Sequence, residues 1–176
     1  LAAKYQKKNI KNSRVKQYDF LKKLEFSEKN LFKIKSHCQK NNIEFMATPF
    51  DRESLKTLIK FKVKKIKVAS SDLNNFELLD LIQKTKKPII LSSGLSSINE
   101  IKKSLIFLNK KGLKKNKTTL LHCTTSYPTP DKEINLRVLQ SFKKLGVKFG
   151  YSDHTIGNEA ALGAVALGAT VIEKHF

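Results

Sequence analysis

The chain has 176 residues, of which 40% are hydrophobic and 28% are charged, so it is long enough and apolar enough to bury a core. With only 7 Gly and 4 Pro, it is neither collagen-like nor of low complexity. The 2 cysteines, Cys38 and Cys123, lie far apart, which argues against a disulfide framework or a zinc ribbon and favours a reducing compartment. The most apolar window, residues 160–172, is too short to cross a bilayer, and we therefore expect a soluble cytoplasmic protein with no membrane partner.

Lys and Arg number 35 against 15 Asp and Glu, which gives a formal net charge of +20. One interpretation is a non-catalytic basic module that binds nucleic acid or another polyanion. Against it, the arginines are only Arg14, Arg52 and Arg137, although Arg makes the bidentate phosphate and guanine contacts that specific recognition favours. The lysines are also spread along the chain. We favour a lysine-rich solvated surface around a site for a small anion, and expect no specific nucleic-acid partner.

Residues 1–26 are polar and lysine-rich and predict a loop that leads into a helix over residues 27–39. Short apolar runs with β-branched residues then alternate with helical patterns. The expected strands cover residues 43–48, 65–70, 88–93, 119–124, 147–152 and 169–175. Further helices are expected where apolar residues recur with helical spacing, over residues 76–82, 98–108 and 136–145.

Two local signals support the starts of these helices. Ser97 and Glu100 form a capping-box pair at the start of the helix over residues 98–108. Pro130 stands near the start of the helix over residues 136–145, where its missing N–H costs nothing. Strand, helix and strand in repeating order predict parallel βαβ units, and so an α/β protein.

Each predicted strand finishes in small or polar residues, among them Thr48, Ser70, Ser92, Ser152 and His175. Both a (β/α)8 barrel and a doubly wound open sheet bind ligands at the carboxyl ends of their strands. No glycine-rich dinucleotide loop follows any predicted strand, so we favour the (β/α)8 TIM barrel. Six strands cannot close that barrel, and the chain begins with Leu1. We expect residues 1–176 to be a partial barrel domain that holds about strands 3 to 8.

Two histidines are the best candidates for metal ligands. His154 and His175 follow consecutive predicted strands, one βα unit apart, so their side chains are expected within reach of one ion. Two imidazoles with oxygen ligands suit a divalent transition metal. The alternative, equally open from the pattern, is that each histidine makes only local hydrogen bonds.

Lys67 lies inside a predicted strand, where a buried ammonium group is costly unless it is paired. It could hold an anion in the barrel mouth, or it could face solvent together with Lys65 in an alternating pattern. The hydroxyls of Ser70, Ser92 and Ser152 at the strand ends suit phosphate or carboxylate binding. His122 and Cys123, by contrast, are expected in the core. Taken together, the candidate histidines, Lys67 and the strand-end serines indicate a metal-assisted barrel enzyme for an anionic small molecule.

Three motifs carry a family resemblance. They read HCTTSYPTP at residues 122–130, GYSDHTIG at residues 150–157 and LGATVIEKHF at residues 167–176. In order and spacing they resemble the sialic acid synthase family, whose members make N-acetylneuraminate, legionaminate or pseudaminate. The resemblance runs from about residue 43 to residue 176.

The resemblance implies a transferase of carbohydrate biosynthesis that condenses phosphoenolpyruvate with N-acetylmannosamine or a related open-chain amino sugar and releases phosphate. It implies a divalent metal, first of all Mn2+ with Mg2+ or Co2+ as substitutes, held by His154 and His175. Lys67 and these two histidines are the expected catalytic residues. The substrate-binding residues implied are Lys67 and the hydroxyl-bearing Thr48, Ser70, Ser92, Thr125, Tyr127 and Ser152. Asparagine is common in the family where Thr125 stands.

Some parts of the family's machinery have no counterpart in the sequence given. An acidic residue and a lysine from the family's first two strands would precede Leu1, and a further catalytic Asp would follow Phe176. A carboxy-terminal antifreeze-like domain, which brings an arginine into a partner subunit's site, is also absent. We therefore expect the fragment to be inactive by itself and the full-length protein to be an active homodimer. Legionaminate or pseudaminate synthase is the alternative within this enzyme class.

Overall fold

The computed structural model describes residues 18, 22 and 24–175, and the chain divides into two compact units, residues 1–45 and residues 46–176. In the first unit, helix α3 (Glu28–Lys40) begins after Ser27, whose hydroxyl accepts a hydrogen bond from the N–H of Asn30. This confirms the helix predicted over residues 27–39. Most of the loop predicted over residues 1–26 lies outside the described residues.

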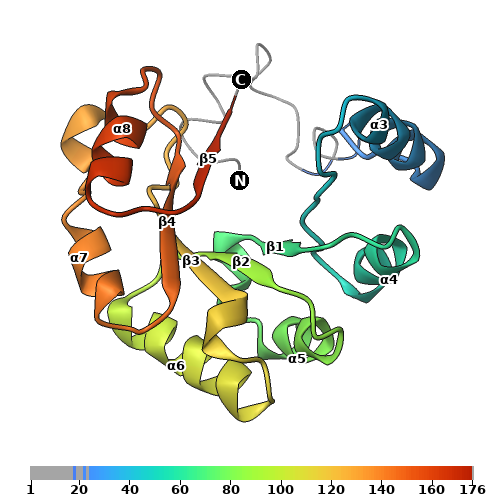
Figure 1. The fold of residues 1–176 in the computed structure, drawn as a ribbon, viewed down its shortest axis with the longest axis horizontal. Coiled ribbons are helices and arrows are strands. Elements are labelled where there is room, and N and C mark those ends of the chain that lie inside the picture. The colour runs from blue at the N-terminus through green and yellow to red at the C-terminus, as the bar shows by residue number, and fades with distance from the viewer. Residues whose placement is uncertain (1–17, 19–21, 23, 176) are drawn as a thin grey trace. The chain divides into compact units, whose positions relative to one another are not determined.

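The second unit is built on one parallel sheet. Its strands are β1 (Ile66–Val68), β2 (Ile89–Ser92), β3 (Thr118–Cys123), β4 (Lys148–Asp153) and β5 (Ile172–Lys174), and they pair in that order. All four pairings are parallel. Because the order never reverses, the sheet has no topological switch point, which excludes the doubly wound alternative. The strands form a parallel half-barrel, seen in Figure 1 as a curved row of arrows.

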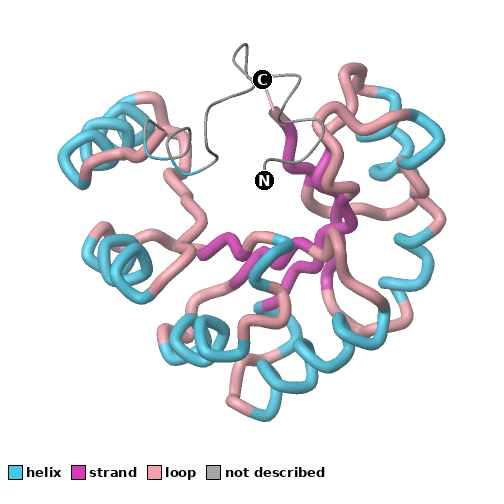
Figure 2. The backbone as a smooth tube through the Cα atoms, turned by 180° about the vertical axis from the view of Figure 1, so that it is seen from behind, coloured by secondary structure: helices cyan, strands magenta, loops and turns pink. Residues whose placement is uncertain are grey.

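Helices alternate with the strands and cover one side of the sheet. They are α4 (Arg52–Lys60), α5 (Phe76–Lys84), α6 (Ile98–Lys110), α7 (Val138–Lys143) and α8 (Glu159–Ala166). Short 3-10 turns lie at Ser70–Asp72, Lys115–Lys117 and Asp131–Glu133. Figure 2 shows these helices outside the strands. The core lies between the two layers, and its fully buried side chains include Leu79, Leu91, Leu120, Phe142 and Tyr151.

Two sequence predictions about these elements are wrong. Residues 43–48 have no regular structure, because an extended run becomes a strand only when its backbone pairs with a neighbour, and the sheet begins at β1. The helix expected over residues 136–145 is shorter, and Pro130 precedes the 3-10 turn at Asp131–Glu133 instead. Asn135 has a left-handed backbone (φ 45), which separates that turn from α7.

The sequence analysis did not predict α4, although its signal is present. Asp51 caps the helix by accepting a hydrogen bond from the N–H of Ser54, and the Ser54 hydroxyl accepts one from the N–H of Asp51. The capping box predicted at Ser97 and Glu100 is confirmed at the start of α6.

The topology gathers many lysines at one end of the sheet. Four segments lead from the ends of helices into the next strand, and none contains Asp or Glu. They are residues 60–65, 84–87, 110–117 and 143–148, with Lys60, Lys62, Lys64, Lys65, Lys84, Lys86, Lys87, Lys110, Lys111, Lys114, Lys115, Lys117, Lys143, Lys144 and Lys148. In a parallel sheet these segments lie at the amino ends of the strands. Lysines are favourable there, because the helix dipole places negative potential at a helix carboxyl end.

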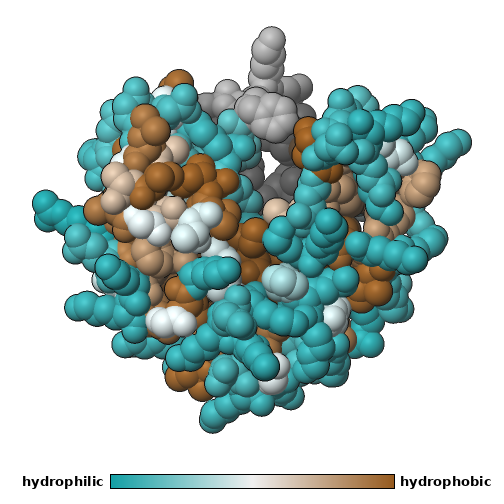
Figure 3. All heavy atoms as spheres, viewed as in Figure 1, coloured by the Kyte–Doolittle hydropathy of each residue, from teal (hydrophilic) through white to brown (hydrophobic). Residues whose placement is uncertain are grey.

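The space-filling view shows hydrophilic residues over most of the visible face, with apolar residues gathered on one side, over α7 and α8 (Figure 3). Large apolar residues of this region that are exposed include Ile156, Leu162 and Val165. In the described part of the chain, no helix is both long and apolar enough to cross a membrane.

Candidate functional site

Polar side chains from the first and last strands meet on the inner face of the sheet. The Lys67 ammonium group on β1 donates hydrogen bonds to the Ser92 hydroxyl (2.8 Å) and to the backbone oxygen of Val68 (3.1 Å). It also lies 3.6 Å from Oε1 of Glu173 on β5. Lys67 is only 7% exposed, so the solvent-facing alternative for this residue is wrong. Burial lowers the pKa of Lys67, and the negative charge of Glu173 opposes that shift.

Glu173 connects Lys67 to the next polar group along the inner face. Its Oε2 accepts a hydrogen bond from the Ser152 hydroxyl at 2.6 Å, and the two residues are register partners on β4 and β5. The sequence analysis did not select Glu173 as a site residue. The signal was available: side chains on a strand alternate between faces, so Glu173 must share the inner face with His175 if Ser152 shares it with His154.

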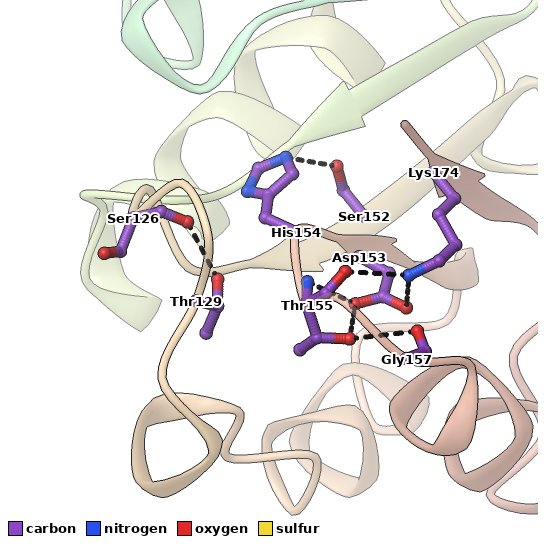
Figure 4. A network of polar contacts seen from close by, with 8 residues as sticks. All are labelled: Ser126, Thr129, Ser152, Asp153, His154, Thr155, Gly157 and Lys174. Carbon is purple, nitrogen blue, oxygen red and sulfur yellow. Dashed lines mark hydrogen bonds and ion pairs between the residues drawn. The ribbon is translucent and has the colours of Figure 1, made fainter. Parts of the chain in front are cut away.

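His154 is held by the segment that follows β3. Its Nδ1 lies 2.7 Å from the backbone oxygen of Thr124, and its Nε2 lies 3.4 Å from the Ser152 hydroxyl (Figure 4). Since a carbonyl oxygen only accepts, Nδ1 carries the proton and the Nε2 lone pair remains for a ligand. Burial lowers the pKa of His154, and the nearby His175 lowers it further. The hydrogen bond to the Thr124 carbonyl acts in the opposite direction and raises it. The lowered pKa favours the neutral imidazole, which is the form that binds a metal.

Three rings cluster beside these strand ends. The ring centroids of His154 and His175 are 5.4 Å apart. Tyr127 lies against both, with its ring 4.1 Å from that of His154 and 5.6 Å from that of His175. The structure thus brings His154 and His175 close together, as their positions after consecutive strands predicted, and the ring of Tyr127 packs against both.

A second group of predicted residues surrounds Gly94, after β2. The Ser70 hydroxyl accepts a hydrogen bond from the N–H of Gly94 (3.0 Å) and lies 3.1 Å from the sulfur of Cys123. A Cβ added to Gly94 would lie 2.6 Å from the Thr125 side chain, 2.7 Å from the Cys123 sulfur and 2.9 Å from the Ser70 hydroxyl. Ser70, Cys123 and Thr125 can therefore all pack this closely around residue 94 only because it is glycine. In the part of the chain that the structure describes, no hydrogen bond joins Thr48 to either group.

Behind the histidines, on the other face of the sheet, lies a buried ion pair. Lys174 and Asp153 are register partners, and the Lys174 ammonium group lies 2.7 Å from Oδ2 of Asp153, which is fully buried. Oδ1 of Asp153 accepts hydrogen bonds from the N–H and the hydroxyl of Thr155 (2.9 and 2.7 Å). Burial alone would raise the pKa of Asp153, but the bonds from Lys174 and Thr155 hold it below its usual range.

His154 and His175 are the two side chains of this site that could hold a metal ion together. Two imidazoles at neighbouring strand ends suit a divalent transition metal. Residues 18, 22 and 24–175 contain no group of three or more His, Cys, Asp or Glu side chains placed as metal ligands.

His122 and Cys123 are both buried, which confirms their expected place in the core. The His122 ring packs edge-on against Phe142 and lies 5.7 Å from the ring of Tyr151, and its Nε2 is 2.9 Å from the backbone oxygen of Ile134. Burial lowers the pKa of His122, although the Ile134 carbonyl opposes the shift. Cys123 differs in that it also borders the site, through its contact with Ser70.

Comparison with known proteins agrees with the fold and the motifs. A model of the NeuB family matches residues 1–176. The chain is 46% identical over 177 residues to the N,N'-diacetyllegionaminic acid synthase of Campylobacter jejuni, covering 99% of this chain and 52% of that protein. It is 36% identical to the Legionella pneumophila protein of the same name, covering 99% of this chain and 49% of that protein. The chain thus spans about half the length of the curated relatives it matches.

A solved structure gives the same result for the fold. The N-acetylneuraminic acid (sialic acid) synthetase of Leptospira borgpetersenii, determined in complex with citrate, superposes with a TM-score of 0.85 and 37% identity. The match covers 98% of this chain and 59% of that chain. This confirms that the five-stranded half-barrel is part of a (β/α)8 TIM barrel.

Proposed function

This chain belongs to the NeuB family, and we propose that it forms the anion-binding and metal-binding part of a nonulosonate synthase. The reaction is the condensation of phosphoenolpyruvate with an open-chain acetamido sugar such as N-acetylmannosamine, with release of phosphate. One observation supports it above the others: a buried lysine, three strand-end hydroxyls and two histidines share the inner face at the carboxyl ends of the strands.

Lys67 is the anion-binding residue in this proposal. Its ammonium group is buried. Glu173 supplies a carboxylate beside it, whereas its two hydrogen-bond acceptors, the Ser92 hydroxyl and the Val68 carbonyl, are neutral. A phosphoenolpyruvate anion would add negative charge where the ammonium group is poorly solvated, so their attraction is stronger than on the surface. The hydroxyls of Ser70, Ser92 and Ser152, with Thr125, would orient the phosphate and carboxylate groups.

His154 and His175 would hold the divalent metal, with Mn2+ as the first candidate. The hydrogen bond from Nδ1 of His154 to the Thr124 carbonyl keeps Nε2 available as the ligand. A metal bound there would supply Lewis-acid polarisation of the sugar's aldehyde oxygen. Tyr127 closes one side of the histidine pair and would limit the access of water.

The condensation forms one carbon–carbon bond and breaks one carbon–oxygen bond. The methylene carbon of phosphoenolpyruvate forms a bond to the aldehyde carbon of the sugar, and the aldehyde oxygen takes up a proton. Water adds to the resulting cation at the adjacent carbon and loses a proton, and phosphate leaves with cleavage of its C–O bond. The residues of this chain position the two substrates for that step, while groups from the rest of the full-length protein would complete the site.

Among possible products, N,N'-diacetyllegionaminate has the strongest support. The two relatives with nearly full coverage of this chain that are described above both carry that name. The test is to supply full-length enzyme with phosphoenolpyruvate, Mn2+ and a panel of acetamido sugars, and to identify products by mass spectrometry. We expect a nonulosonate with release of one phosphate for each product. If the enzyme binds phosphoenolpyruvate but forms a nonulosonate from none of the sugars in the panel, the proposed reaction is refuted.

A further inference from the structure

The buried pair Asp153–Lys174 stands in a distinctive place relative to the two histidines. Each member directly precedes one of them in the sequence, and the two members are register partners on β4 and β5. Because side chains alternate along a strand, the pair lies on the outer face while His154 and His175 lie on the inner face. An ion pair between the last register partners therefore sits directly behind the histidine pair.

Lys174 also reaches past the end of the ladder. Its ammonium group donates a second hydrogen bond to the backbone oxygen of Thr155 at 3.0 Å, in addition to its contact with Asp153 at 2.7 Å. Asp153 in turn binds both the N–H and the hydroxyl of Thr155. Figure 4 shows these bonds around one lysine head group. The residues on both sides of His154 are thus tied to the residue that precedes His175.

We propose that Lys174 and Asp153 are positioning residues that set the spacing and orientation of His154 and His175 for one metal ion. This inference rests on the proposed function, since it assumes that the two histidines bind a metal. The β4–β5 ladder ends with Asp153 and Lys174, so the backbone pairing of these strands does not extend to the histidines themselves. Beyond that point, the bonds from Lys174 and Asp153 to Thr155 constrain the segment that carries His154.

The burial of the pair supports a role beyond general stability. Asp153 is fully buried, and burying a carboxylate beside an ammonium group is seldom better for stability than packing two apolar side chains there. When a group that orients a metal ligand through a hydrogen bond is removed, metal affinity commonly falls about tenfold to a hundredfold. The Lys174 ammonium group makes two hydrogen bonds, one to Asp153 and one to the Thr155 carbonyl, and Met, of similar length, can make neither.

The test uses the full-length protein and the variant Lys174→Met. We expect its dissociation constant for Mn2+, measured by titration calorimetry without substrate, to rise about tenfold to a hundredfold. We also expect faster amide hydrogen exchange at Thr155 in the metal-free protein. Lys174→Arg retains the charge and a donor, so it should recover part of the affinity.

A matched control is available on the surface. Lys84 and Asp80 form an ion pair of the same 2.7 Å length on helix α5, and Lys84→Met should leave Mn2+ affinity unchanged. If Lys174→Met fails to fold, Asp153→Asn with Lys174→Met removes both charges and is measured instead. Weaker Mn2+ binding by either variant supports the positioning role.

The outcomes separate this inference from the proposed function. Wild-type protein that binds Mn2+, with Lys174→Met and the double variant binding equally well, overturns the positioning role and leaves the synthase proposal intact. Wild-type protein that binds no Mn2+, or His154→Ala that binds it as well as wild type, overturns the metal site and the positioning role together.

Discussion

The ammonium group of Lys67 lies 3.6 Å from Oε1 of Glu173, although these residues stand on the first and last strands of the five-stranded sheet. A flat sheet would hold such strands four spacings apart, at about 4.8 Å for each spacing. The contact therefore exists because the sheet curls into a half-barrel and its inner side chains converge. The positive charge of Lys67 on one edge strand is thereby paired with the negative charge of Glu173 on the other edge strand.

The convergence gives a first prediction, for Lys67→Ala in the full-length enzyme. We expect KM for phosphoenolpyruvate to rise more than KM for the sugar, because the lost contact is to the anion. A charged hydrogen bond in a partly desolvated site contributes about 1.5–3 kcal/mol, which corresponds to roughly tenfold to a hundredfold. Steady-state kinetics with Lys64→Ala as an exposed control decides the matter. Equal effects on both substrates would contradict the assignment.

The second prediction concerns the metal. His154→Ala should nearly abolish turnover while the circular dichroism spectrum and unfolding temperature stay close to those of wild type. Excess Mn2+ should restore little activity, because a ligand has been removed and the remaining imidazole cannot reproduce the geometry. Activity of the wild-type enzyme that survives exhaustive chelation would contradict this prediction.

Gly94 gives a third prediction, about close packing. In Gly94→Ala the new methyl group would lie within 2.9 Å of Thr125, Cys123 and Ser70, so these side chains must move. We expect a loss of about 1–3 kcal/mol in the free energy of unfolding, together with weaker phosphoenolpyruvate binding. Chemical denaturation and substrate titration measure the two effects. Gly163→Ala, in helix α8, is a comparison in which the added Cβ meets only the Leu136 side chain at 3.0 Å.

His122 makes the stability of the barrel depend on pH. Burial lowers its pKa from the ordinary 6.5, so the unfolded chain binds its proton more readily than the folded chain. The contribution of neutral His122 is thus complete above about pH 6.5 and is lost as the pH falls through the lower pKa of the folded state. Denaturation at pH 7.5 and pH 5.5 should show this loss, and His122→Gln should reduce it. An unchanged pH dependence in that variant would exclude His122 as its source.

The last prediction concerns the positive charge. The lysines of the segments between helices and strands lie at the amino ends of the strands, whereas the histidines follow the carboxyl ends of β4 and β5. We expect weak attraction to DNA at low salt, since counterion release requires only charge, and no binding at about 0.15 M salt. The synthase reaction should be unaffected by DNA. Submicromolar binding at that salt with a base preference would support the basic-module interpretation instead.

Much of the fold could be predicted from the sequence, because local patterns carry it. The alternation of apolar runs with helical periods predicts parallel βαβ units, and the Ser97–Glu100 pair locates the start of α6. The same local reasoning failed at residues 43–48, since a strand depends on a partner that the run itself does not contain. It failed again before α7, where the left-handed backbone of Asn135 prevents the helix from starting as early as predicted.

The candidate site divides in the same way. From the sequence alone, His154, His175 and Lys67 could be selected, because their residue types are unusual at the ends or in the bodies of apolar runs. Only the tertiary structure placed Glu173 between Lys67 and Ser152, and Lys174 behind the histidines against Asp153 and Thr155. Those relationships depend on the curvature and register of the sheet. Curvature and register arise from the packing of all the strands and helices together, which no single segment of the sequence encodes.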